Sequence, residues 1–423
     1  MSEKLNTDFL LRDGGFSNSV DTPNLARHRW YYYKEGFSPN LVAQAIEQSG
    51  VKKNDLIIDP FNGSGTTTLT SSINGFNSVG IEVNPFTAFL SKAKVINISP
   101  KRVEAVKGQL MRSVKKGAAS PLIGYSTFSE RPGLRKWLFN EAILNSFEGG
   151  WQFADSIKDE EVQQLMKLAL ISTAMENCNA RKDGKCLRYY RNWDINDFNN
   201  ESFGNALERN LQMIGEDLES IHFLGNAKIL SGDCRQILNT SENIDGFSLC
   251  VTSPPYLNTF DYTDIYRPEL FLGKFITGSE SLKGLRMKTV RSHIGVQWAT
   301  PVKSDFGMLY EQSISHVSNN LDQLMHRQIP MMIQAYFEDM HQILSSLRQK
   351  SARNAQVWLV VSNSAYAGME IPVDLIIGDI ATRAGWFLKE IGVMRYVRKR
   401  KTKYSPEIKD LRESVIILSA SKY

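Results

Sequence analysis

The chain has 423 residues, of which 42% are hydrophobic and 22% are charged. This composition is globular and sufficient for two or three cores at about 150 residues each, and it excludes disordered, collagen-like and coiled-coil chains. Fifty lysines and arginines against forty-five acids give a formal net charge of +5. That mild excess suits a polyanionic partner and many cytosolic enzymes alike, so charge alone does not select a function.

The cysteines and the apolar runs exclude several further classes. The four cysteines form no CxxC pair and have no histidine at metal-ligand spacing, so neither a zinc site nor a disulfide framework is expected. The N-terminus has no apolar stretch of signal-peptide length, and no run of about 18 apolar residues could span a bilayer. We therefore expect a cytoplasmic protein without a metal site or a membrane segment.

Strand-like runs fall into two blocks along the chain. In the first, residues 56–59 and 78–82 read as short apolar strands, and residues 66–74 between them are compatible with a helix, which predicts a βαβ unit. The second block contains strand-like runs at 228–230, 248–252, 357–361 and 414–418, with helical patterns at 331–347 and 373–383. This alternation predicts a single α/β sheet.

Two segments interrupt the predicted sheet. Residues 100–225 read as almost wholly helical, because apolar residues such as Val162, Leu165, Met166 and Ala169 recur on one helical face. The second segment, residues 278–328, is polar and irregular. We therefore predict a discontinuous α/β domain over 21–99, 226–277 and 329–423, a helical insertion over 100–225, and a second insertion over 278–328.

A glycine loop follows the first strand and opens a helix. Backbone N–H groups and the helix dipole at such a helix start can hold a polar ligand group, and Gly63 and Gly65 allow a close approach. The loop lacks a P-loop lysine and the third glycine of the dinucleotide fingerprint. Glu82 ends the next strand, 23 residues after Asp59, where a carboxylate can accept both ribose hydroxyls. The pattern predicts an adenosine-type ligand without a required pyrophosphate; the alternative is a tight turn beside a solvated acid.

The segment Ser253-Pro254-Pro255-Tyr256 closes an apolar strand. Its two prolines lack N–H donors, so the strand end offers carbonyls that only accept hydrogen bonds. An exocyclic amino group suits this site, because Ser253 Oγ and the Pro254 carbonyl can take its two hydrogens and aim the nitrogen lone pair at an electrophile. Tyr256 offers a flat face for stacking a base extruded from a duplex. The alternative is a Pro-Pro turn with an incidentally buried tyrosine.

These segments resemble the amino-methylating DNA methyltransferases, which transfer a methyl group from S-adenosylmethionine to N4 of cytosine or N6 of adenine. Residues 59–66 are similar to the family's motif I, residues 80–85 to motif II and residues 231–234 to motif III. Residues 252–256 match the catalytic motif IV, and residues 33–42 resemble motif X. The order X, I, II, III, IV excludes the permuted arrangement in which the catalytic motif comes first.

The resemblance implies a Rossmann-like, seven-stranded α/β sheet that binds S-adenosylmethionine and carries an inserted helical domain. It does not reach the helical insertion itself. By this resemblance the discontinuous α/β domain is the catalytic domain, residues 100–225 are a candidate target-recognition or DNA-binding region, and residues 278–328 are a candidate DNA-contacting loop. Cofactor binding is implied for Phe37, Ser38, Asp59, Phe61, Gly63, Gly65, Thr66, Glu82, Asn84 and Asp233. Catalytic roles are implied for Ser253, Pro254, Pro255 and Tyr256.

Serine at position 253 is usual among the cytosine-N4 members, whereas adenine members mostly carry Asp or Asn there. We therefore expect methylation of cytosine N4 in duplex DNA, with base flipping, in a restriction-modification or related system whose nuclease is a separate chain. N6-adenine methylation and methylation of RNA or protein amino groups on the same fold remain alternatives. A further alternative is a non-catalytic nucleic-acid-binding subunit.

Basic clusters indicate where DNA phosphates could bind. The cluster at 181–191 is favoured because aromatic residues interleave its cations, while 395–403 contains six basic residues and no acid, and 283–293 is a third cluster. We predict DNA contacts from Arg181, Lys182, Lys185, Arg188, Arg191, Arg398 and Arg400. Residues close behind Ser253 either shape the target pocket or form a helix cap and its first turns: Asp261, Tyr262, Tyr266, Arg267 and Glu269.

Overall fold

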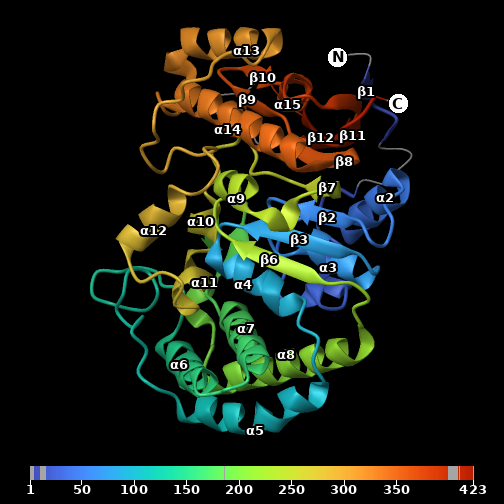
Figure 1. Cartoon of the computed structure of the whole chain (residues 1–423). Helices are drawn as coiled ribbons and strands as arrows, with labels where there is room; N and C mark the ends of the chain where they lie inside the picture. The colour runs from blue at the N-terminus through green and yellow to red at the C-terminus, as the bar shows by residue number, and fades with distance from the viewer. Residues whose placement is uncertain (1–3, 10–15, 185, 399–407, 409, 423) are drawn as a thin grey trace.

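A mixed eight-stranded sheet organises the computed structural model, which describes residues 4–9, 16–184, 186–398, 408 and 410–422 (Figure 1). Across the sheet the strands are ordered β1 (Leu5–Asn6), β11 (Phe387–Arg398), β12 (Asp410–Ser419), β8 (Ser351–Ser362), β7 (Phe247–Thr252), β2 (Leu56–Asp59), β3 (Asn77–Glu82) and β6 (Ala227–Ser231). Strand β12 is antiparallel to both of its neighbours, whereas the ladder from β8 to β6 is parallel.

The chain order creates a switch point between β2 and β7. From β2 the chain adds β3 and then β6 on one side, and from β7 it adds β8 and the C-terminal strands on the other. Ile58 of β2 pairs with Cys250 of β7 in parallel register, so the two strands end at the same edge of the sheet. Ligands of open α/β sheets bind at the carboxyl ends of the strands at such a switch point.

The Rossmann-like α/β class is confirmed, and the sheet has one strand more than the expected seven. The extra strand, β1, is only two residues long, lies at the edge of the sheet and pairs with β11. The six strand-like runs of the sequence are all strands, but β11 was not predicted. Its sequence mixes charged and apolar residues, as an edge-side strand permits, and its pairing with β12 is broken by two register shifts.

Helices cover both faces of the sheet, so its strands alternate between two apolar cores. Ile57 faces the core formed with α2 (Pro39–Ser49), and Ile58 faces the core formed with α14 (Ile329–Lys350). The helices at 331–347 and 373–383 are confirmed as α14 and α15 (Val373–Arg383). The remaining helices beside the sheet are α3 (Thr66–Ile73), α4 (Pro85–Lys94) and α9 (Cys234–Thr240).

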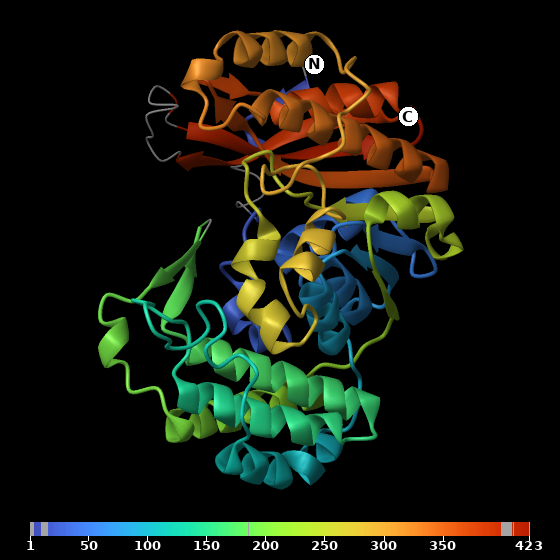
Figure 2. The same ribbon diagram turned by 90° about the vertical axis from the view of Figure 1, so that its left-hand side faces the viewer.

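The helical insertion lies beneath the sheet in Figure 1 and shares a hydrophobic core with α4 and with residues 260–285. It is built from α5 (Pro100–Lys116), α6 (Glu141–Asp155), α7 (Glu160–Glu176) and α8 (Asn200–Ser220). It is not wholly helical, however. Strands β4 (Ala180–Asp183) and β5 (Cys186–Tyr189) form a hairpin, seen in green at the left of Figure 2, which projects from the helices.

The second insertion is more regular than its polar sequence indicated. It contains α12 (Ser279–Arg286) and α13 (Met308–Asn319), and α10 (Tyr262–Ile265) and α11 (Arg267–Leu272) precede it. Strands β9 (Ser364–Tyr366) and β10 (Met369–Ile371) form a small separate hairpin. Short 3-10 turns occupy Thr22–Asn24, His28–Trp30, Trp193–Ile195, Glu242–Ile244 and Leu321–Gln323. The domain boundaries stay a prediction.

The described residues contain neither a helix suited to span a membrane nor a metal-binding group of side chains. None of their helices has the length and apolar character needed to cross a bilayer. Over the same residues, His, Cys, Asp and Glu side chains do not gather in a group of three or more that could hold a metal ion.

Candidate active site

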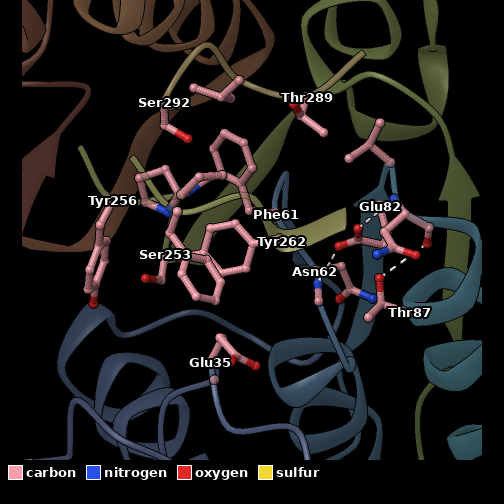
Figure 3. A pocket seen from close by; sticks show the side chains of 18 of the residues that line it. Glu35, Phe61, Asn62, Glu82, Thr87, Ser253, Tyr256, Tyr262, Thr289 and Ser292 are labelled. Carbon is pink, nitrogen blue, oxygen red and sulfur yellow. Dashed lines mark hydrogen bonds between the residues drawn. The ribbon is translucent and has the colours of Figure 1, made fainter. Parts of the chain in front are cut away.

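A cavity of about 360 Å³ opens at the carboxyl ends of β2, β3 and β7 (Figure 3). Segments far apart in the sequence meet there: residues 33–37, the loop 59–66, residues 81–84, residues 253–263 and the segment 288–293. The switch point of the sheet therefore gathers the segments that the sequence singled out, and adds part of the second insertion.

Most of the predicted site residues line this cavity. The lining includes all four predicted catalytic residues and eight of the ten predicted cofactor residues: Phe37, Asp59, Phe61, Gly63, Thr66, Glu82, Asn84, Asp233, Ser253, Pro254, Pro255 and Tyr256. Gly65 and Ser38 are not part of the lining. Ser38 caps α2, accepting a hydrogen bond from Asn40 N (3.1 Å).

The glycine loop is shaped by its contacts with β3 and α4. Gly65 caps α3 at a φ of +87°, and a Cβ there would lie 2.9 Å from Ser91 Cβ. The Gly63 N–H donates to Glu82 Oε2 (2.7 Å). Glycine is therefore required at 65 by the turn and by the close approach of α4, while Gly63 fastens the loop to the end of β3.

Glu82 lies where a ribose-binding acid was expected. Its second oxygen, Oε1, accepts from Asn84 N (2.8 Å), and burial raises the pKa of the carboxyl group. Each carboxylate oxygen has a further acceptor site, and Figure 3 shows the group at the cavity edge. The arrangement fits a ligand with vicinal hydroxyls.

Asp233 is held from the side by Arg235. The carboxylate caps α9 by accepting from Arg235 N (2.9 Å), and it forms an ion pair with the Arg235 guanidinium (2.7 Å). Arg235 also pairs with Asp339 of α14 (2.9 Å) and donates to the carbonyls of Lys288 (3.3 Å) and Thr289 (3.2 Å). One guanidinium thus fixes both Asp233 and the segment 288–293 at the cavity.

Asp59 joins the glycine loop to the strand that precedes Ser253. It is 1% exposed, and its Oδ1 accepts from Phe61 N (2.9 Å) and from Thr252 Oγ1 (2.6 Å). Burial raises the pKa of this carboxyl to about 6, although the hydrogen bonds oppose the shift. Asp59 therefore holds two cavity segments together.

The Ser-Pro-Pro-Tyr segment leaves β7 beside β8 and β12. Ser253 Oγ donates to the Val360 carbonyl (3.2 Å), and Tyr256 Oη donates to Glu413 Oε1 (2.8 Å). Pro254 and Pro255 have no N–H to offer, so the backbone at this wall of the cavity presents acceptors.

Several cavity residues were missed by the sequence reasoning. Glu35 points into the cavity from the wall opposite Thr289 and Ser292 (Figure 3), accepts from the Tyr266 hydroxyl, and has its pKa raised by burial. It lies within the motif X-like segment, which was a usable signal. Glu413 is a buried acid in strand β12, two residues before the apolar run 415–418, and an acid beside such a run was the only sequence signal for it.

The acids exceed the bases in this cavity. Its lining contains six carboxylates, from Glu35, Asp59, Glu82, Asp233, Asp261 and Glu413, against two lysines and one arginine, Lys34, Lys288 and Arg395. An S-adenosylmethionine molecule carries a sulfonium, an ammonium and one carboxylate. Three of the six carboxylates, Asp233, Asp261 and Glu413, already pair with arginines. The fit to this cofactor therefore rests on the ribose-binding geometry of Glu82 and on the Glu35 carboxylate.

Lys182 is not available for DNA phosphates, and this prediction is corrected. Its side chain is 13% exposed, forms an ion pair with the fully buried Glu269 (2.5 Å), and donates to Tyr31 Oη (2.7 Å). Its ammonium also lies 3.6 Å from the Tyr266 ring centroid. An unpaired buried Glu269 would be costly, so Lys182 fastens the β4–β5 hairpin to the protein interior.

The other predicted DNA residues differ in their accessibility. Arg181 and Arg191 are exposed, and Arg188 is exposed while pairing with Asp183 (2.5 Å). Lys185, Arg400 and the side chain of Arg398 lie outside the described residues. Gly184 at the turn of the β4–β5 hairpin lines the cavity. The hairpin, which carries Arg181 and Arg188, therefore reaches the mouth of the cavity.

Cations of the 283–293 cluster form ion pairs within the protein, one of them with Asp261. In the 283–293 cluster, Arg286 pairs with Asp261 (2.6 Å), and Arg291 pairs with Glu338 (2.6 Å) and Asp339 (2.8 Å). Asp261 also caps α10 while lining the cavity, so both interpretations of this acid hold.

The chain is similar to known methyltransferases. Residues 15–92 match a family model described as DNA methylase, N6_N4_Mtase. The chain is 27% identical to the Type II methyltransferase M.BsoBI of Geobacillus stearothermophilus, over 86% of this chain and 79% of that protein. It is 26% identical to the Type II methyltransferase M.AvaI of Anabaena variabilis, over 87% and 80% respectively. The structure of the rRNA methyltransferase aviRa of Streptomyces viridochromogenes aligns with 91% of this chain and 85% of its own chain. The sequence identity is 8% and the TM-score is 0.30.

Proposed function

Because the chain belongs to the amino-methylating DNA methyltransferase family, we propose that it transfers a methyl group from S-adenosylmethionine to the exocyclic N4 of cytosine in duplex DNA. The observation that carries this proposal is one shared cavity. Ser253 and Pro254, which accept hydrogen bonds, open onto the same space as the glycine loop and Glu82. A base amino group and an adenosine-type methyl donor can therefore meet there.

S-adenosylmethionine supplies an electrophilic sulfonium methyl group when it is bound. Glu82 would accept its ribose hydroxyls, and Asp233 would lie near its adenine. Glu35 supplies a carboxylate for its positively charged end, since the segment 33–36 packs on the glycine loop, with a Gly63 Cβ position 3.3 Å from the Tyr33 ring and a Gly36 Cβ position 3.7 Å from Thr66 Oγ1.

The chain contributes positioning and electrostatics to the transfer. Ser253 Oγ and the Pro254 carbonyl accept the two amino hydrogens, so the nitrogen lone pair is left for the methyl group. Both acceptors also stabilise the positive charge that develops on the nitrogen. Ser253, rather than Asp or Asn, favours cytosine as the target; N6-adenine methylation is the alternative on the same cavity.

A base inside a duplex cannot reach this cavity, so we infer that the target nucleotide is flipped out of the stack and rests on the face of Tyr256. The exposed arginines Arg181 and Arg188 on the β4–β5 hairpin, and Arg191 just after it, would bind the phosphates beside the flipped nucleotide. A cytoplasmic restriction-modification system with a separate cognate endonuclease is the setting that this activity suits.

The test is methyl transfer by the purified protein from labelled S-adenosylmethionine to unmethylated duplex DNA, total RNA and a protein extract. We expect label in DNA alone, and none with Ser253→Ala. Ser346→Ala, which removes a buried serine hydroxyl on α14 outside the cavity, is the matched control and should transfer normally. Label in RNA or protein, or cofactor binding without transfer to any substrate, would contradict the proposal.

A further inference from the structure

Glu413 is a buried acid in the wall of the active-site cavity that no predicted motif includes. It lies on β12 and is 3% exposed, in a strand whose following residues, 415–418, are all apolar and buried. In the sheet it pairs with Arg395 of β11 on one side and Ser362 of β8 on the other. The position costs desolvation energy, which the surrounding donors must offset.

Three side chains donate hydrogen bonds to the Glu413 carboxylate. Ser17 Oγ donates to Oε2 (2.5 Å), and Arg395 Nε donates to the same oxygen. Tyr256 Oη donates to Oε1 (2.8 Å). The arginine and the serine hold the carboxylate in place, so Oε1 is a fixed acceptor for the tyrosine of the Ser-Pro-Pro-Tyr segment.

The Tyr256 hydroxyl has a single proton, which it donates in the hydrogen bond to Glu413. The phenol stays neutral, because burial and the nearby carboxylate both raise its pKa well above the ordinary value. Ser253, at the start of the same segment, donates its own proton to the Val360 carbonyl (3.2 Å). A chain of hydrogen bonds thus runs from Tyr256 to Glu413 and on to Arg395 and Ser17.

We propose that Glu413 is a positioning residue for methyl transfer, acting through the Tyr256 hydroxyl to hold the Tyr256 ring beside Ser253. A ring fixed in this way presents one face to the flipped base, and the stacked base then places its amino group at Ser253 Oγ and the Pro254 carbonyl. No proton leaves the chain in this role. The inference rests on the proposed function and deepens it.

The same geometry separates two roles of Tyr256. Its ring face is left for the flipped base, whereas its hydroxyl belongs to the Glu413 chain. Tyr256→Phe therefore keeps the face and removes the chain, and it leaves the contacts of Glu413 with Arg395 and Ser17 in place. This variant tests the proposal without disturbing the ion pair.

The experiment compares Tyr256→Phe, Glu413→Gln and the double variant by single-turnover methyl transfer to DNA and by calorimetric binding of S-adenosylmethionine. Each single variant should lower the transfer rate by roughly tenfold to a hundredfold, with cofactor affinity within about twofold of the wild type. The double variant should be no slower than the slower single variant, since both changes break one chain.

Matched controls separate this effect from the loss of a buried group. Tyr336→Phe removes a buried hydroxyl that has no hydrogen-bond partner among the described residues, and Glu148→Gln removes a buried acid paired with Lys274 (2.9 Å) outside the cavity. Both should transfer at the wild-type rate. An unchanged rate for Tyr256→Phe, or additive losses in the double variant, would overturn the inference. Absence of transfer by the wild-type protein would instead overturn the proposed function, and the inference with it.

Discussion

Thr252 Oγ1 donates a 2.6 Å hydrogen bond to Asp59 Oδ1, so the residue before Ser253 is tied to the first residue of the glycine loop. The same oxygen accepts from Phe61 N (2.9 Å). One buried carboxylate therefore sets the distance between the loop that faces the cofactor and the segment that faces the target base. The protonation state of Asp59 should control both.

Asp59 makes cofactor binding depend on pH. Burial raises the pKa of its carboxyl to about 6, so the group is mostly ionised at pH 7 and protonated below pH 6. Protonation weakens Oδ1 as an acceptor, and we expect affinity for S-adenosylmethionine to fall as the pH drops through about 6. Titration calorimetry between pH 5 and 8 measures this, and Asp59→Asn should abolish the inflection. An inflection that persists in the variant would contradict the assignment.

Protonation of Asp59 should have opposite effects on the free energy of unfolding and on cofactor binding. The folded-state pKa of Asp59 lies above the ordinary value of about 4, so the folded state binds the proton more tightly than the unfolded state. The contribution of this group to the free energy of unfolding therefore decreases as the pH rises from about 4 to about 6. A loss of binding at pH 5.5 should accordingly occur without a loss of stability from Asp59.

Gly65→Ala should destabilise the fold around the loop. Alanine is strained at a φ of +87°, and its Cβ would lie 2.9 Å from Ser91 Cβ. We expect the free energy of unfolding to fall by about 1–3 kcal/mol, measured by denaturant titration. Gly204→Ala is the matched control, because it lies in α8 with open space around its Cβ position, and it should raise stability by about 0.5–1 kcal/mol. Equal effects of the two changes would contradict the packing argument.

Lys182→Met should act on stability rather than on DNA affinity. It leaves the fully buried Glu269 without its cation, which costs about 3–5 kcal/mol of unfolding free energy. Thermal melting of the variant measures the effect. A stable Lys182→Met protein with weakened DNA binding would restore the original prediction that this lysine contacts phosphate.

Arg181→Ala and Arg191→Ala should act on DNA affinity rather than on stability. Both side chains are exposed, so their removal should leave the melting temperature nearly unchanged. If each contacts a phosphate, log affinity for duplex DNA against log salt should lose about 0.9 of slope per arginine. An unchanged slope in both variants would move the DNA-binding face away from the β4–β5 hairpin.

Glu35→Gln should distinguish the methyl donor from its product. The donor carries a sulfonium charge that S-adenosylhomocysteine lacks, so removing a cavity carboxylate should weaken donor binding by about tenfold and product binding by less. Calorimetry with both ligands gives the ratio. Equal weakening of the two would show that Glu35 does not sense the sulfonium charge.

The sequence predicted the parts of the site that lie on continuous segments. The loop 59–66, Glu82 and residues 253–256 were identifiable because a strand, a turn and a functional group follow one another in the chain. Glu413 was not, since its role depends on β12 lying beside β8, a pairing between distant residues. Strand β11 was missed for a similar reason: its partner strand, and not its own composition, makes it a strand.

Lys182 shows why charge patterns mislead without tertiary structure. In the sequence it is one of several cations in a basic run, yet alternation along β4 turns it inward while Arg181 faces solvent. Residues 283–293 were a candidate DNA-contacting cluster, and the structure places Lys288, Thr289, Ser292 and His293 of this cluster in the cavity wall, with Arg235 bonded to the carbonyls of Lys288 and Thr289. Neither outcome could be read from residue types alone.

The most direct test of the account is the identity of the methylated nucleoside. Duplex DNA is incubated with the protein and S-adenosylmethionine, digested to nucleosides and analysed by mass spectrometry, with Ser253→Ala in parallel. We expect N4-methylcytosine with the wild-type protein and none with the variant. N6-methyladenine would keep the cavity and its amino-group chemistry but contradict the choice of base, and 5-methylcytosine would contradict the mechanism itself.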